Sequence, residues 1–224
     1  MNDELMIDVR RLDHAYRHGG VVEPVLHELD LRVRRGEFVV IMGPSGCGKT
    51  TLLNILGLMM APTRAESVRL AGVETLGLCD AARTRLRRET LGFVFQRFNL
   101  LSTLSVRRNV ALALQVRNLR LDGQVERLIG HCGLTECARK KPGQLSMGQQ
   151  QRVAVARALV GQPDLLLADE PTGNLDSANA GAILDLLSGF HRVRGQTVVM
   201  ITHNEQLAVA ADRVLHMRDG RFVA

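Results

Sequence analysis

The stretch that decides the fold is FVVIMGPSGCGKTTLLNILGLMM, residues 38–60. It opens with five apolar residues, Phe38 to Met42, a composition typical of a strand that is buried on both faces. Eight residues of the form G-x-x-x-x-G-K-[ST] follow, and an apolar-rich segment, Lys49 to Met60, has a helical pattern. A glycine-rich turn that leads into a helix directs several backbone N–H groups at one anion. The sequence therefore predicts a strand, a phosphate-binding loop and a helix in succession.

The residue types in this loop suit a nucleotide polyphosphate. Lys49 supplies a positive charge for the β- and γ-phosphates, and Thr50 supplies a hydroxyl for Mg²⁺. Cys47 is a thiol at a helix N-terminus, and we expect its oxidation or alkylation to block nucleotide binding. The predicted nucleotide contacts of the loop are Gly43, Pro44, Ser45, Gly46, Cys47, Gly48, Lys49, Thr50 and Thr51.

A pair of acidic residues follows a second apolar run, Leu165 to Ala168. Asp169 at the end of this strand is placed to hold the water shell of a metal ion, and Glu170 is placed to polarise an attacking water. The alternative is a plain strand end that carries two acidic residues. The phosphate loop upstream favours the catalytic interpretation.

The remaining patterns predict an α/β fold that forms one continuous domain, residues 1–224. Two alternating segments flank Gly19-Gly20 and indicate an antiparallel N-terminal β subdomain, whereas buried apolar runs separated by helical patterns indicate a parallel-sheet core. A helical pattern from Ser102 to Val160 indicates an inserted α-helical subdomain at about residues 97–160. The expected elements are strands at Leu5–Val9, Leu26–Val33, Leu165–Ala168 and Thr197–Ile201, a helix at Ala180–Val193, and a hairpin of Arg213–Met217 and Arg221–Val223 around Asp219-Gly220.

Composition excludes several classes. With 46% hydrophobic residues and a net charge of +6, the 224-residue chain resembles an ordinary globular protein, and no apolar run is long enough to cross a bilayer. Aromatic residues make up only 3%, which argues against a base-stacking surface for nucleic acid. The first ten residues show no leader pattern, so we expect a cytoplasmic location. The four cysteines lack C-x-x-C spacing and are expected to be free thiols, without a zinc site at His131, Cys132 and Cys137.

Several further motifs follow the phosphate loop in a fixed order. They are Gln96, the run Leu145-Ser146-Met147-Gly148-Gln149, Asp169-Glu170, Asn174-Leu175-Asp176 and His203. This series resembles the ATPase subunit of ATP-binding cassette (ABC) systems over essentially the whole chain, and residues 145–149, the signature run, are its most specific part. The resemblance implies a P-loop NTPase with a RecA-like core that binds ATP and Mg²⁺ and hydrolyses ATP.

The resemblance also implies a role for individual residues. Tyr16 resembles the aromatic residue that stacks on adenine, and Gln96 the glutamine that meets Mg²⁺ and senses a membrane partner. His203 resembles the switch histidine on the γ-phosphate, and Asp176 the aspartate that couples two sites across a dimer. Ser146, Gly148 and Gln149 are then expected to close on the γ-phosphate of the opposite subunit. The implied catalytic residues are Glu170, His203 and Lys49, and the implied metal-binding residues are Thr50, Gln96 and Asp169.

Structural alternatives stay open for these single residues. Tyr16 also fits an edge-strand aromatic, Gln96 a surface loop residue and His203 a structural histidine. Ser146 fits a helix N-cap, which is compatible with anion binding. Met147 departs from the family pattern, which usually has glycine there, so we expect binding to persist and turnover to be affected.

Finer resemblance, including Leu86-Arg87-Arg88 and residues 91–96, lies with the bacterial branch that serves lipoprotein release and macrolide-type efflux. It implies a homodimer at the inner face of the cell membrane, bound to an integral permease-like subunit. A cell-division ATPase is one alternative. A soluble ABC ATPase that acts on nucleic acid is another, but the chain shows neither heptads nor paired cysteines, so we expect no nucleic-acid partner. The basic cluster Arg83, Arg85, Arg87 and Arg88 suits either a membrane-side partner or a solvated face.

Overall fold

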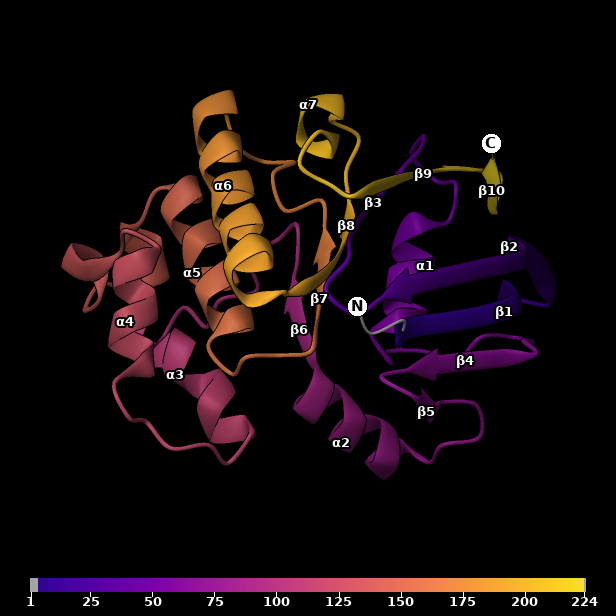
Figure 1. The fold of residues 1–224 in the computed structure, drawn as a ribbon, viewed down its shortest axis with the longest axis horizontal. Helices are drawn as coiled ribbons and strands as arrows, with labels where there is room; N and C mark the ends of the chain where they lie inside the picture. Colours follow the sequence, from indigo (N-terminus) through magenta and orange to yellow (C-terminus); the bar gives the residue numbers. More distant parts are fainter. Residues whose placement is uncertain (1–3, 224) are drawn as a thin grey trace.

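The computed structural model describes residues 4–223, in which two sheets and seven α-helices form the fold (Figure 1). An antiparallel sheet has the order β2-β1-β4-β5, and a mixed sheet has the order β10-β9-β3-β8-β7-β6. The strands are β1 Leu5–His18, β2 Val21–Arg34, β3 Phe38–Met42, β4 Ser67–Leu70, β5 Val73–Glu74, β6 Leu91–Val94, β7 Leu165–Asp169, β8 Thr197–Ile201, β9 Arg213–Arg218 and β10 Arg221–Val223. The helices are α1 Lys49–Leu56, α2 Asp80–Thr90, α3 Val106–Val116, α4 Gln124–His131, α5 Met147–Leu159, α6 Ser177–Arg194 and α7 Glu205–Ala208, with short 3₁₀ helices at Thr135–Cys137 and Pro142–Gln144.

The mixed sheet lies between two hydrophobic cores, as the apolar composition of β3 predicted. Phe38, Val40 and Met42 belong to the core shared with α3 to α6. Val39 and Ile41 point to the opposite side, into the core shared with α1 and the antiparallel sheet. Figure 1 shows these two layers on either side of the sheet. Because both faces are buried, β3 carries no polar residue, and the side chains alternate between two apolar environments.

The parallel register brings the ends of three strands together. β3 pairs with β8 and β9 in parallel, and β8 pairs with β7 so that Asp169 lies opposite Ile201. The carboxyl ends of β3, β7 and β8 therefore share one edge, which is where ligands bind in sheets of this kind.

Several boundaries differ from the predictions for physical reasons. α1 ends at Leu56 and not at Met60, because Leu58 adopts a left-handed φ of 56° and its N–H bonds to the carbonyl of Ile55 at 3.0 Å, which does not continue the helical pattern. β1 and β2 are each 14 residues long, and bulges that include Arg11 and Glu28 at positive φ interrupt the simple alternation that marks a strand. β4, β5 and α2 were not predicted, since two of them are short strands and α2 has few apolar residues.

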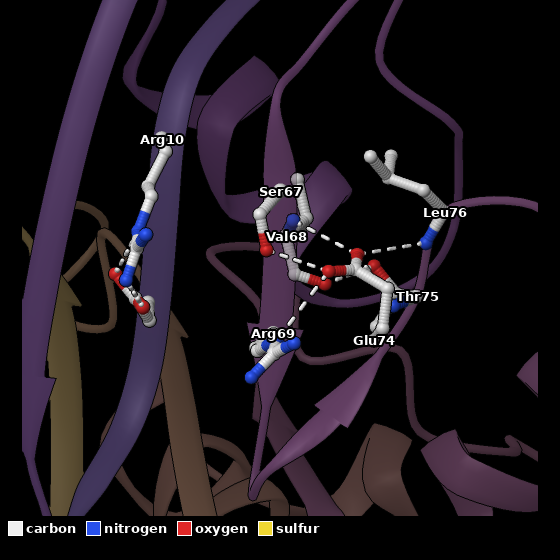
Figure 2. A network of polar contacts seen from close by, with 8 residues as sticks. Arg10, Ser67, Val68, Arg69, Glu74, Thr75 and Leu76 are labelled. Carbon is white, nitrogen blue, oxygen red and sulfur yellow. Dashed lines mark hydrogen bonds and ion pairs between the residues drawn. The ribbon is translucent and has the colours of Figure 1, made fainter.

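A half-buried carboxylate, that of Glu74, fastens the β4–β5 hairpin, as Figure 2 shows. Glu74 accepts hydrogen bonds from the hydroxyl of Ser67 at 2.5 Å and from the backbone N–H groups of Val68, Thr75 and Leu76. Burial alone would raise its pKa, but these bonds hold the pKa of Glu74 below its ordinary value. The side chain of Glu74 thus adds to the short pairing of β4 with β5, which covers only two residue pairs.

The predicted helical insertion contains α3, α4 and α5, and its bounds at about 97–160 remain a prediction. Ser105 caps α3 as its side chain accepts from the N–H of Arg108, and buried Asn109 ties the preceding loop to α3 through Leu101. α5 packs against both α3 and β6, so it connects the insertion to the mixed sheet. None of the helices within residues 4–223 is long and apolar enough to cross a membrane.

Candidate active site

The phosphate loop follows β3 and wraps around a lysine. Gly46 and Gly48 adopt φ of 79° and 103°, a conformation that glycine allows without a steric penalty. The Nζ of Lys49 donates to the carbonyl oxygens of Gly43 and Pro44 at 2.8 and 2.7 Å. Because Lys49 is only 6% exposed, its charge is held inside the loop that the sequence predicted to bind phosphate.

The C-terminal hairpin of β9 and β10 supports this loop. The sequence did not predict this contact. The backbone N–H of Gly220 donates to the carbonyl of Cys47 at 3.1 Å, and the N–H of His27 donates to the carbonyl of Gly220 at 3.1 Å. A Cβ on Gly43 would overlap the backbone carbonyl of Met217. The Asp219-Gly220 turn predicted the hairpin correctly, but the sequence carries no signal for its position against residues 43–48.

A hydroxyl and a carboxylate meet at the shared edge of the sheet. The Oγ1 of Thr50, at the start of α1, donates to Oδ1 of Asp169 at 3.3 Å. Burial raises the pKa of Asp169, the bond from Thr50 lowers it, and the neighbouring Glu170 raises it again, so that it lies above its ordinary value. A hydroxyl and a carboxylate oxygen in contact are the oxygen donors that Mg²⁺ prefers, and the pair fits the predicted metal.

Glu170 and His203 lie beside this pair. The Oε1 of Glu170 is 3.5 Å from Nδ1 of His203, which follows β8 and is mostly exposed. Glu170 has a φ of 41°, and its N–H donates to the carbonyl of Ile201 at 3.0 Å. A positive φ is uncommon for a residue other than glycine, and such strain is concentrated at functional positions. The parallel pairing of β7 with β8 thus brings Glu170 beside His203.

Gln96 lies next to the loop that follows Glu170. Its carbonyl accepts a hydrogen bond from the amide of Asn174 at 3.2 Å, and a Cβ on Gly173 would be 3.0 Å from its Nε2. Downstream of Gln96, the guanidinium of Arg157 on α5 donates to the carbonyl oxygens of Phe98 and Asn99 at 2.9 and 2.5 Å. The loop of Gln96 is thereby attached to both the mixed sheet and the helical insertion.

Tyr16 lies beside the phosphate loop, near the end of β1. Its hydroxyl is 3.2 Å from Oγ1 of Thr51, and His14 packs edge-on against its ring with centroids 4.9 Å apart. Burial lowers the pKa of His14, which favours the neutral form of its ring. Stacking of Tyr16 on adenine stays a prediction, as does the alternative of an edge aromatic.

The signature run begins α5. The hydroxyl of Ser146 accepts from the N–H of Gln149 at 3.2 Å, and the side chain of Gln149 accepts from the N–H of Ser146 at 3.0 Å. This capping box confirms the helix N-cap that the sequence predicted. Met147 is 57% exposed and Gly148 packs against Asn179. Within the described residues no hydrogen bond joins this run to the phosphate loop.

The cysteines show no sign of a metal centre in the part of the chain that the structure describes, 4–223. Cys47, Cys132 and Cys137 are buried and Cys79 is exposed, all as free thiols. Burial raises the pKa of Cys132 to about 12, so its thiol is protonated near neutral pH. Cys132 and Cys137 belong to the apolar core of the helical region, whereas Cys47 belongs to the core on the other side of the sheet.

Comparison with known proteins decides the family. The model described as "ABC transporter" matches residues 26–173, which include the phosphate loop, the signature run and the Asp169-Glu170 pair. The chain belongs to the ABC transporter ATPase family. It is an ABC ATPase, as the resemblance of its motifs indicated.

The similar proteins span two kinds of system. The chain is 44% identical to "Lipoprotein-releasing system ATP-binding protein LolD 1" of Rhodopseudomonas palustris, covering 97% of this chain and 99% of that protein. It is 47% identical to "Macrolide export ATP-binding/permease protein MacB 1" of Aeromonas hydrophila, with 96% of this chain on 34% of that protein. It superposes on the dimeric cassette MJ0796 bound to ADP and Pi with a TM-score of 0.91, at 38% identity and 98% coverage. The chain is thus an ABC transporter ATPase of the LolD/MacB type with the cassette fold.

Proposed function

We propose that this chain powers a membrane partner of the lipoprotein-release or macrolide-efflux kind by ATP-driven closure of a homodimer. The observation that carries the chemistry is the edge where Thr50 meets Asp169 and Glu170 meets His203. The similarity to LolD supports the choice of partner. The similarity to MacB, whose name combines an ATP-binding part with a permease, supports it as well. The chain then lies at the inner face of the membrane through that partner.

Each residue at this edge of the mixed sheet has a separate role in ATP hydrolysis. Lys49 and the N–H groups of the phosphate loop hold the β- and γ-phosphates, and Tyr16 faces the base. Thr50, Asp169 and Gln96 hold Mg²⁺, which when bound neutralises charge on the phosphates. Glu170 accepts a proton from the attacking water, while His203 orients that carboxylate and contacts the γ-phosphate. The backbone N–H of Glu170 donates to the carbonyl of buried Ile201, which holds the start of this loop against β8.

Dimer closure completes each site. Ser146, Gly148 and Gln149 lie at the start of α5, and a helix N-terminus favours an anion. Since no hydrogen bond joins them to the phosphate loop within the described part of the protomer, we assign them, with Asp176, to the nucleotide of a second copy. Two copies related by a twofold axis then form two equivalent sites. The exposed Met147 reaches the same surface and slows closure without preventing it.

Two variants test this function. We expect Glu170→Gln to lower ATP turnover by about 10²-fold to 10⁴-fold, because general base catalysis contributes that much. ATP binding should persist, and the variant should form a dimer with ATP and Mg²⁺. Captured from detergent-solubilised membranes in that state, it should bring down a membrane protein with a large extracytoplasmic domain. The matched control is Glu89→Gln, an exposed glutamate on α2.

Unchanged turnover in Glu170→Gln would contradict the catalytic assignment. Recovery of a soluble dimer alone, or of nucleic acid, would contradict the membrane partner and leave the ATPase chemistry intact. Chelation of divalent cations should abolish turnover of the native protein. Turnover that survives chelation would contradict the metal assignment of Thr50, Gln96 and Asp169.

A further inference from the structure

Asn179, in the first turn of α6, touches two segments that are far apart in the sequence. Its side-chain amide donates to both carboxylate oxygens of Asp176, at 3.0 and 2.9 Å, and its backbone N–H donates to Oδ1 of Asp176 at 2.8 Å. On the other side, its side chain lies against Gly148 of the signature run. A Cβ added to Gly148 would be 2.5 Å from Cγ of Asn179 and 3.1 Å from its Cβ.

This arrangement leaves each of the three residues little freedom. Three hydrogen bonds from two nitrogen atoms of Asn179 hold the carboxylate of Asp176, and they keep its pKa below its ordinary value. Gly148 permits the close approach because it has no side chain, and any larger residue would have to displace the amide. The capping box of Ser146 and Gln149 also holds the first helical turn of α5 in place. The starts of α5 and α6 are therefore joined through one amide side chain.

We propose that Asn179 is a positioning residue that keeps the signature run and Asp176 at a fixed separation, so that both reach the second copy's nucleotide as one rigid unit. The proposal rests on the proposed function, in which these two segments act across the dimer. It assigns no chemistry to Asn179, which acts only through Gly148 and Asp176. It also gives a reason for glycine at 148 that does not involve the nucleotide.

The test is a double-mutant cycle in the Glu170→Gln background, with ATP-driven dimerisation measured by light scattering after gel filtration. Asn179→Ala should raise the ATP concentration needed for dimerisation by about tenfold or more, because hydrogen bonds to a charged carboxylate are lost. Gly148→Ala should cause a similar loss by displacing the amide. The double variant should come close to Asn179→Ala alone, since the added methyl group then meets only the Cβ of residue 179, at 3.1 Å, a contact that a small shift relieves. Asn179→Asp, nearly the same shape, should lose as much by repelling Asp176.

Two readouts separate positioning from a fold defect. The affinity of the monomer for a fluorescent ATP analogue should stay within about twofold of the parent. Its unfolding midpoint should stay within about 2 °C, because Asn179 is only half-buried and bonds to an exposed carboxylate. When Asn179→Ala is made in the protein that keeps Glu170, kcat for ATP hydrolysis should fall while KM for ATP changes little. Ser177→Ala, on the exposed side of the same turn, is the control and should behave like the parent.

Two outcomes overturn the coupling proposal while leaving the proposed dimer function intact. One is ATP-driven dimerisation that is unchanged in Asn179→Ala. The other is a Gly148→Ala defect that is equally large when Asn179 is absent, which would show that glycine is needed for the nucleotide itself. If the Glu170→Gln parent binds ATP but stays monomeric, the proposed dimer function fails first, and the coupling proposal fails with it.

Discussion

Gly220→Ala tests whether the C-terminal hairpin holds the phosphate loop in shape. Gly220 is buried with a φ of +74°, and a Cβ there would overlap the backbone carbonyl of Val25. Its N–H and carbonyl bond to Cys47 and His27. The added methyl group should push the β9–β10 turn away from β2, so that both hydrogen bonds weaken together and residues 43–48 lose a support.

The magnitude follows from these contacts. An alanine with positive φ costs about 1 kcal/mol. Each of the two backbone hydrogen bonds contributes about 1 kcal/mol net. We therefore expect the free energy of unfolding to fall by about 3 kcal/mol, which for a chain of this size lowers Tm by about 6–12 °C. Loss of the bond to Cys47 alone should weaken ATP binding by about fivefold.

Gly72→Ala is the matched control for this experiment. Gly72 has a φ of +81° in an exposed hairpin turn, and nothing lies within 4 Å of a Cβ built there. It should incur the backbone cost alone, about 1 kcal/mol, with unchanged ATP affinity. Differential scanning calorimetry and titration with ATP measure both quantities. If Gly220→Ala and Gly72→Ala gave the same Tm and the same ATP affinity, the hairpin would not support the loop.

Three further predictions concern the core, an acid and a thiol. Leu167→Ala, at a fully buried site of β7, should lower the free energy of unfolding by about 3 kcal/mol in urea, whereas exposed Val193→Ala should change it by less than about 0.5 kcal/mol. The pKa of Glu74 is lowered on folding, so the ionised carboxylate stabilises the fold above its ordinary pKa of 4.5, and this stabilisation is lost as the pH falls below that value. The difference in free energy of unfolding between the native protein and Glu74→Gln should therefore be present at pH 7 and disappear below about pH 4. Alkylation of buried Cys47 should block ATP binding and be slowed by ATP, while modification of exposed Cys79 should leave binding unchanged; equal protection of both thiols would contradict this.

Local sequence patterns were sufficient to predict an element where its burial or capping depends on residues close to it in the chain. The apolar run 38–42 predicted a strand covered on both faces, and Ser146 predicted a helix N-cap, because burial and capping depend on residues within a few positions. The end of α1 was predicted four residues late, since apolar residues continue past Gly57 and only the cap geometry ends the helix. β4 and β5 were missed because their pairing depends on β1 and on the carboxylate of Glu74.

The sequence by itself determined the chemical groups of the candidate site and the fold class that carries them. Phosphate loop, acidic pair and signature run are short motifs, in which spacing along the chain fixes the chemistry. Tertiary structure alone decided which of these groups meet. Thr50 contacts Asp169 and Glu170 contacts His203 because parallel register aligns the carboxyl ends of three strands. Asn179 contacts Gly148, and Gly220 supports Cys47, through packing between distant segments. Such contacts depend on the whole fold and leave no local pattern.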